Sequence, residues 1–284
     1  MPPTQPSGLE RARAVVAKLR GPDGCPWDRA QTHESLRRYL LEETYEVLEA
    51  LDELATNPTT GSEKLKEELG DLLLQVLLQA EIAGETGRFD IDGLANDLAA
   101  KLVRRHPHVF GGEKLESAEE VVGAWEKTKQ EEKPRESTLD GLPPGMPALQ
   151  QSLKIIERVS KVGFQWPSLE GPLEKCREEL EEFLSEVEKL GKPAKFGREE
   201  GAALDKKTKL RLESELGDLI FSLSNIAHFL HLNPEDALRS MLRRFEKRFR
   251  HVETRARVDG KKLADMPLDE MDIYWNEAKR LEKP

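Results

Sequence analysis

Apolar side chains recur every three or four residues along most of the chain, which is the spacing that places them on one face of an α-helix. Proline and glycine pairs interrupt this pattern and mark the helix ends. No convincing run alternates apolar and polar residues with a period of two, so the sequence predicts an all-α protein. The predicted helices cover about residues 9–20, 32–55, 62–85, 90–105, 117–131, 148–161, 169–190, 208–230, 234–258 and 267–281.

The same succession of helices occurs twice. A segment with four prolines and two glycines, residues 133–147, separates the two stretches. Such a composition is typical of a linker. The sequence therefore predicts two tandem helical domains, each resembling a four-helix bundle, at residues 1–132 and 148–284.

Each half also carries the same pair of acidic motifs. In the first half E-E-x-x-E (residues 42–46) precedes E-L-G-D (residues 68–71), and in the second half the same motifs occupy residues 178–182 and 215–218. Residues three apart share a helix face, so each motif directs two carboxylates the same way. Four carboxylates brought together repel one another unless a cation lies between them. A hard divalent cation such as Mg²⁺ prefers oxygen ligands and fits this role.

The position of these carboxylates on their helices supports a metal site. Glu43 lies within an apolar stripe that runs from Leu36 to Leu54, and Asp71 lies on the line of Leu78. A carboxylate in such a place is partly withdrawn from water, which costs free energy unless it has a partner. Chance pairing of acidic residues on a solvated face explains one such motif, but not the same spelling in both halves.

A second repeated pattern is basic and aromatic. Lys101 and Arg105 lie four residues apart on one predicted helix, and Arg244 and Arg248 occupy the matching place in the second half. Each set alone fits a solvated face or core packing. Beside a carboxylate-bound metal, however, cations and a planar ring are what a nucleotide polyphosphate requires. Each basic pair is followed by a tryptophan and, four residues later, a lysine: Trp125 with Lys129, and Trp275 with Lys279.

Composition narrows the class of protein. Charged residues make up 35% of the chain and the net charge is −10, which argues against general binding to nucleic acids. The strongly apolar stretch at residues 72–80 is too short for a membrane span, and the first residues do not resemble a secretory signal. Cys25 and Cys176 form no disulfide framework, so the reducing cytoplasm is the simplest compartment.

Five strings in the first half resemble the MazG nucleoside triphosphate pyrophosphohydrolases. They are C-P-W-D, L-E-E-T-Y-E-V, E-L-G-D-L-L, G-R-F-D and R-R-H-P-H-V-F, between residues 25 and 110. The resemblance covers nearly the whole chain, including its tandem arrangement. It implies the all-α NTP pyrophosphatase fold, a homodimer, dependence on Mg²⁺ with Mn²⁺ as an alternative ion, and hydrolysis of NTP to NMP and pyrophosphate. Apolar runs at residues 72–78 and 219–223, too apolar for a single interface, independently favour a dimer.

In such a reaction a glutamate that is not fully engaged by metal, Glu178 or Glu42, could orient or deprotonate the attacking water. The resemblance also implies roles for individual residues. The implied metal ligands are Glu43, Glu46, Glu68 and Asp71 in the first half and Glu179, Glu182, Glu215 and Asp218 in the second, and the implied nucleotide contacts are Lys101, Arg105, Trp125 and Lys129, with Lys175, Arg244, Arg248, Trp275 and Lys279.

Two positions distinguish the halves. Tyr39 stands where the second half has Lys175, and a lysine one turn before Glu179 puts a phosphate-binding cation beside the metal ligands. This difference favours the second half as the main catalyst. Ser214 favours the first half instead. It replaces the acidic residue that the family usually has there, which the first half keeps as Glu67.

Three functions remain compatible with the sequence. The first is a pyrophosphohydrolase that accepts several NTPs and dNTPs. The second is a narrower enzyme for dUTP, dCTP or phosphoribosyl-ATP, and the third is a nucleotide sensor or helical interaction module in which one or both halves are non-catalytic. The duplication and the C-P-W-D and R-R-H-P-H-V strings favour the first, and complete carboxylate sets in both halves argue against the third.

Overall fold

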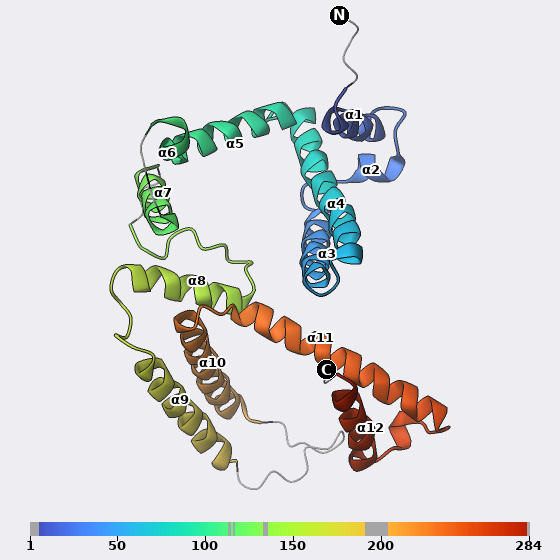
Figure 1. Ribbon diagram of the computed structural model, residues 1–284, viewed down its shortest axis with the longest axis vertical. Helices are drawn as coiled ribbons and strands as arrows, with labels where there is room; N and C mark the ends of the chain where they lie inside the picture. Colours follow the sequence, from blue (N-terminus) through green and yellow to red (C-terminus); the bar gives the residue numbers. More distant parts are fainter. Residues whose placement is uncertain (1–5, 113–114, 116, 133–135, 191–203, 283–284) are drawn as a thin grey trace, which may run out of the picture. The chain divides into compact units, whose positions relative to one another are not determined.

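The computed structural model of the protein describes residues 6–112, 115, 117–132, 136–190 and 204–282. These residues form helices and one short 3₁₀ turn but no strand, which confirms the predicted all-α class (Figure 1). The chain divides into two compact units, residues 1–134 and 135–284. Within the described residues no helix has the length and apolar content that a membrane span requires.

The first unit is built around one helical hairpin. Its helices in the described part of the chain are α1 (Gly8–Arg20), α2 (Pro26–Ala30), α3 (Arg37–Thr56), α4 (Pro58–Glu85), α5 (Ile91–Arg105), α6 (Pro107–Phe110) and α7 (Ala118–Glu132). Helices α3 and α4 form the hairpin and lie side by side (Figure 1). Helix α1 packs against α4 and α2, and α5 contacts α4 and α7.

The core of the first unit lies where α1, the start of α3 and the second half of α4 meet. Val16, Leu36, Leu77, Leu78 and Ile82 form one buried cluster there. Each fully buried side chain of this kind stabilises the fold by roughly 2 kcal/mol. This cluster fixes α4, and with it the acidic motif near the middle of α4.

Helix α4 begins earlier than predicted, at Pro58 and not at Ser62. Proline suits the first turn of a helix, because the amide hydrogen that it lacks would have no partner there. Ser62 Oγ donates to the carbonyl of Pro58 (2.7 Å), so Ser62 is not the N-cap of the helix. Gly61 lies inside the helix, where an added Cβ would come within 2.3 Å of the Leu54 Cα. The predicted break is wrong because this glycine serves the close contact of α3 with α4.

Residues 32–36 form a turn and not the first turn of α3, which also differs from the prediction. The Thr32 amide donates to Ser35 Oγ (2.9 Å), and the Ser35 amide donates to Thr32 Oγ1 (3.1 Å). Side chains of this type compete with the helical backbone for hydrogen bonds. The helix therefore starts only at Arg37, five residues later than the apolar pattern indicates.

The second unit repeats the hairpin. Its helices in the described part are α8 (Ala148–Lys161), α9 (Glu170–Glu188), α10 (Lys206–Phe229), α11 (Pro234–Val258) and α12 (Leu268–Leu281), with the 3₁₀ turn at Leu263–Asp265. Helices α9 and α10 form the hairpin, and α11 packs against α12 (Figure 1). Helix α8 contacts both α10 and α11. A buried cluster of Val252, Ala256, Met266 and Tyr274 joins α11 to α12.

Part of the predicted linker is bound to the second unit. Arg158 on α8 donates from Nη1 to the carbonyl of Thr138 (3.2 Å) and to that of Asp140 (2.7 Å). The Ser137 amide also donates to Asp140 Oδ2 (3.0 Å), which closes a turn. Residues 137–140 therefore belong to the surface of the second unit, although their composition indicates a linker.

Candidate metal and nucleotide sites

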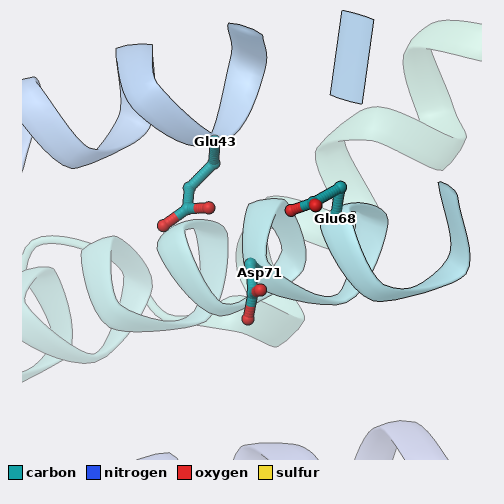
Figure 2. Close-up of side chains that lie close together, drawn as sticks. All are labelled: Glu43, Glu68 and Asp71. Atoms are coloured by element: carbon teal, nitrogen blue, oxygen red, sulfur yellow. The ribbon is translucent and has the colours of Figure 1, made fainter. Parts of the chain in front are cut away.

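The hairpin of the first unit brings three of the predicted metal ligands together. Figure 2 shows Glu43 pointing from α3 toward α4, which carries Glu68 and Asp71. One carboxylate oxygen from each of the three residues lies within 4.8 Å of the other two. Glu43 and Glu68 are half-buried, as their place near the apolar stripe predicts.

The carboxylates of this first acidic cluster repel one another. Burial, followed by the charge of Asp71 and a hydrogen bond with Glu46, raises the pKa of Glu43 to about 6. Burial and then the charges of Glu46 and Glu67 raise the pKa of Glu68. Glu46 thus lies close enough to influence both groups, although it is not one of the three clustered residues. Both shifts follow from negative charges that are brought together and partly withdrawn from water.

This repulsion predicts that Glu43→Gln stabilises the metal-free protein. A folded-state pKa above the unfolded value favours the protonated form, so stability from this group is complete below about pH 4.5 and is lost as the pH rises through 6. The shift corresponds to roughly 1–2 kcal/mol at pH 7. We expect Glu43→Gln to recover that amount in urea unfolding with EDTA, and to flatten the pH dependence between 4.5 and 6.

The control for this prediction is Glu63→Gln, which removes an exposed carboxylate of the same helix as Glu68. Its unfolding free energy should match that of the unaltered protein. If Glu43→Gln is no more stable than the unaltered protein at pH 7, the Glu43 carboxylate is not destabilised by burial and by its acidic neighbours.

The hairpin of the second unit forms a matching second acidic cluster. Oxygens of Glu179 and Glu182 on α9 and of Glu215 on α10 lie within 4.8 Å of one another. Glu179 is only 6% exposed, so its charge is the one most withdrawn from water. Burial and the charge of Glu179 raise the pKa of Glu182. Asp218 is exposed and is not part of this group, so its role as a ligand stays a prediction.

A lysine balances the second acidic cluster. Lys175 Nζ lies 2.7 Å from Glu179 Oε1 and 2.9 Å from Glu178 Oε1, and these contacts raise the pKa of the lysine. The two predicted bases, Glu178 and Glu42, are both exposed, and Glu178 forms an ion pair with this lysine. At the position of the lysine, the first unit has Tyr39, whose ring packs edge-on against Trp27 at 5.7 Å. The second cluster therefore has a lysine paired directly with one of its carboxylates, whereas in the first unit Lys64 lies near Glu68 and pairs with Glu49 (3.3 Å).

Three further cations, Lys206, Lys207 and Arg211, line a pocket beside Glu215 and were not among the residues predicted from the sequence. This pocket, of about 500 Å³, lies at the start of α10. The signal for it is the K-K-T-K-L-R run at residues 206–211, which is separated from the second E-L-G-D by three residues. The lining residues are Lys206, Lys207, Leu210, Arg211, Ser214 and Glu215.

The predicted basic and aromatic residues gather apart from the acidic clusters, on α5 with α7 and on α11 with α12. The Arg105 guanidinium lies 5.8 Å from the centre of the Trp125 ring, and that of Arg248 lies 5.7 Å from the centre of the Trp275 ring. Arg244 donates to Ser240 Oγ (2.8 Å). Of the predicted lysines, Lys101 and Lys279 are exposed, and the side chain of Lys129 lies outside the described residues.

Comparisons with known proteins match this arrangement. The model of the MazG nucleotide pyrophosphohydrolase domain matches twice, at residues 31–110 and 169–253, so each match includes one hairpin with its acidic cluster. A nucleoside triphosphate pyrophosphohydrolase/pyrophosphatase MazG from Thermotoga maritima is 42% identical over 273 residues, 95% of each chain. A nucleoside triphosphate pyrophosphohydrolase from Escherichia coli is 37% identical over 96% of this chain and 98% of its own. One of the same name from Mycobacterium tuberculosis is 46% identical over 55% of this chain and 46% of its own.

Proposed function

Because the chain belongs to the MazG nucleotide pyrophosphohydrolase family, we propose that it hydrolyses nucleoside triphosphates and their deoxy forms to monophosphate and pyrophosphate with Mg²⁺ held by its two acidic clusters. The observation that carries this proposal is the gathering of carboxylates from two helices to within 4.8 Å, once in each half. Acidic residues that are distant in sequence come together in both halves, and Glu43 with Glu68 in the first half corresponds to Glu179 with Glu215 in the second.

The donors of both clusters suit a hard divalent cation. All are carboxylate oxygens, and burial together with neighbouring negative charges raises the pKa values of Glu43, Glu68 and Glu182. A bound Mg²⁺ supplies charge that offsets a triphosphate and makes a water molecule more acidic. Glu43, Glu68 and Asp71 would hold it in the first unit, with Glu46 beside them, and Glu179, Glu182 and Glu215 would hold it in the second, with Asp218 as the further ligand.

Lys175 has two possible sets of partners, the carboxylates that it contacts in the structure and the phosphate oxygens of a bound nucleotide. In the structure it pairs with Glu178 and Glu179. With Glu179 engaged by a divalent cation, the Lys175 ammonium would be available for an oxygen of the triphosphate. Glu178 would then no longer share this lysine, and it could accept a proton from the water that attacks a phosphorus at the α–β bridge. Glu42 is the corresponding base of the first unit.

The basic and aromatic residues would bind the rest of the nucleotide. Trp125 and Trp275 offer ring faces for stacking on a base, and Arg105 and Arg248 lie beside those rings. Exposed lysines on the same helices add charge that a polyphosphate requires. The remaining contacts in this proposal are Lys101, Lys129, Arg244 and Lys279.

A second copy of the chain would complete the sites. In the second unit the acidic cluster lies on α9 and α10, whereas the basic and aromatic residues lie on α11 and α12. Helix α10 also exposes an apolar stripe in which Leu216, Ile220 and Leu223 remain 43%, 40% and 51% exposed. Leucines and isoleucines spaced in this way form one helix face, which a partner helix can cover. We therefore propose a homodimer in which equivalent hairpins pair.

The dimer proposal predicts a mass twice that of the 32.2 kDa chain in light scattering at micromolar concentration. Replacing Ile220 by glutamate should shift the protein toward the monomer, because a charge buried in an apolar interface is costly. Glu213→Gln, at an exposed position of the same helix, should not change the mass. A monomeric mass for the unaltered protein would contradict the proposal.

The decisive test of the function is the identity of the product. Purified protein with Mg²⁺ or Mn²⁺ is expected to release pyrophosphate, and not orthophosphate, from several NTPs and dNTPs, and EDTA should stop the release. Turnover of dUTP, dCTP or phosphoribosyl-ATP alone would favour the narrower enzymes. Orthophosphate as the only product, or no turnover of any common nucleotide, would exclude the proposed activity and leave the sensor.

A further inference from the structure

One arrangement of three side chains occurs in both units, although it belongs to neither acidic cluster. In the first unit Arg105 on α5 lies beside Trp125 and Glu132 of α7, and in the second Arg248 on α11 lies beside Trp275 and Glu282 at the end of α12. Each glutamate follows its tryptophan by seven residues. Seven residues are close to two helical turns, so the ring and the carboxylate share one helix face.

The glutamate binds the same edge of the guanidinium in both units. Arg248 donates to Glu282 Oε2 from Nε (2.9 Å) and from Nη2 (2.7 Å). Arg105 donates to Glu132 Oε2 from Nε (3.1 Å) and from Nη2. Nη1 takes no part in either contact. The guanidinium plane is thus fixed by a carboxylate at one edge and a tryptophan beside it. Among the described residues no acceptor occupies the Nη1 edge, which can therefore bind another acceptor.

The four charged side chains of this arrangement are largely sheltered. Arg105 and Glu132 are 14% and 18% exposed, and Arg248 and Glu282 are 23% and 20% exposed. Hydrogen bonds from Arg105 and then Arg104 hold the pKa of Glu132 at about 2, and a hydrogen bond from Arg248 lowers that of Glu282. Both carboxylates therefore stay charged at neutral pH and hold their arginines continuously.

We propose that Glu132 and Glu282 are positioning residues of the two nucleotide-binding sites. Each holds its arginine beside the tryptophan so that Nη1 faces an anionic oxygen of the nucleotide. A free arginine loses rotamer freedom when it binds a phosphate, whereas one already fixed has less to lose. This inference rests on the proposed function, which assigns both arginines and both tryptophans to nucleotide binding.

A purely structural role is the competing explanation, and the first unit contains a matched pair to test it. Arg20 donates to Glu85 from Nε (2.7 Å) and Nη2 (2.9 Å) and so ties α1 to α4. Glu85→Ala removes the same kind of contact between helices that carry no predicted nucleotide contact at this point. The Glu85→Ala variant therefore measures how much the loss of such an ion pair lowers the stability of the fold when no nucleotide contact is involved.

The experiment measures binding of an α,β-methylene NTP analogue, which resists cleavage at the α–β bridge, to the full-length protein with Mg²⁺ by calorimetry. We expect Glu282→Ala and Glu132→Ala each to weaken binding at its own site about tenfold, as loss of an orienting partner typically does. KM should rise with little change in kcat, because the lost contact serves ground state and transition state alike. Glu282→Gln should recover part of the affinity, since its amide oxygen still accepts from the arginine. Glu85→Ala should lower the melting temperature and leave affinity unchanged.

A double-mutant cycle separates positioning from other effects. If Glu282 acts through Arg248, adding Glu282→Ala to Arg248→Ala should weaken binding no further. Equal weakening in both backgrounds would overturn the proposal, as would unchanged affinity in both glutamate variants while Arg105→Ala and Arg248→Ala lose it. These outcomes differ from failure of the proposed function itself, in which the unaltered protein would neither bind the analogue nor release pyrophosphate.

Discussion

Glu179→Gln is expected to lower the rate of pyrophosphate release on the order of 10²-fold, whereas Glu43→Gln should leave most of the rate. The reason is the cation next to Glu179. Lys175 lies 2.7 Å from that carboxylate and can meet the triphosphate there, whereas Tyr39 at the matching place packs against Trp27. Because the first unit has no lysine at this position, it should be the slower site.

The acidic residue next to the metal ligands favours the first unit as the faster site, so the comparison of the two variants separates the two arguments. Glu67 contributes to the raised pKa of Glu68 in the first unit, whereas Ser214 in the second unit leaves Glu215 beside a pocket lined by lysines. Glu181→Gln, an exposed neighbour of Glu179 on α9, is the control and should keep full activity. If Glu43→Gln loses the activity and Glu179→Gln keeps it, with both folded by circular dichroism, the first unit is the main catalyst.

Lys175→Met should also lower the rate about 10²-fold, because a cation that meets phosphate charge in the transition state is removed. The same substitution should increase the stabilisation that the protein gains from binding Mg²⁺. The lysine now neutralises Glu179, which is 6% exposed, so its removal leaves a buried charge without a partner. We therefore expect a lower melting temperature in EDTA and a larger rise on adding Mg²⁺ than in the unaltered protein. Melting curves with and without the ion measure both changes.

Lys189→Met is the matched control for this variant. Lys189 follows α9 and pairs with Glu186, so the change removes a lysine of the same hairpin away from the acidic cluster. Rate and metal response should stay unchanged. If Lys175→Met keeps its rate while its melting temperature falls, the lysine stabilises the metal-free protein and does not serve the reaction.

The sequence alone determined which residues are helical and that the pattern repeats. Apolar spacing places most helices within a few residues of their observed ends because amphipathic periodicity is a local property. It misplaced the starts of α3 and α4. At Thr32 and Ser35 side-chain hydrogen bonds replace backbone ones, and at Gly61 a close contact with Leu54 uses the glycine that otherwise indicates a break.

The candidate chemistry was likewise visible in the sequence, since repeated acidic motifs specify oxygen donors wherever their helices pack. Only the tertiary structure decided which donors meet. Packing of each hairpin brings Glu68 to Glu43 and Glu215 to Glu179, while Asp218 stays exposed. The partners of the charged side chains were equally beyond the sequence, because an ion pair between residues 34 positions apart, such as Arg248 with Glu282, depends on where α12 folds back along α11. Local spacing determines which side chains share a helix face, and tertiary packing determines which residues of other helices that face contacts.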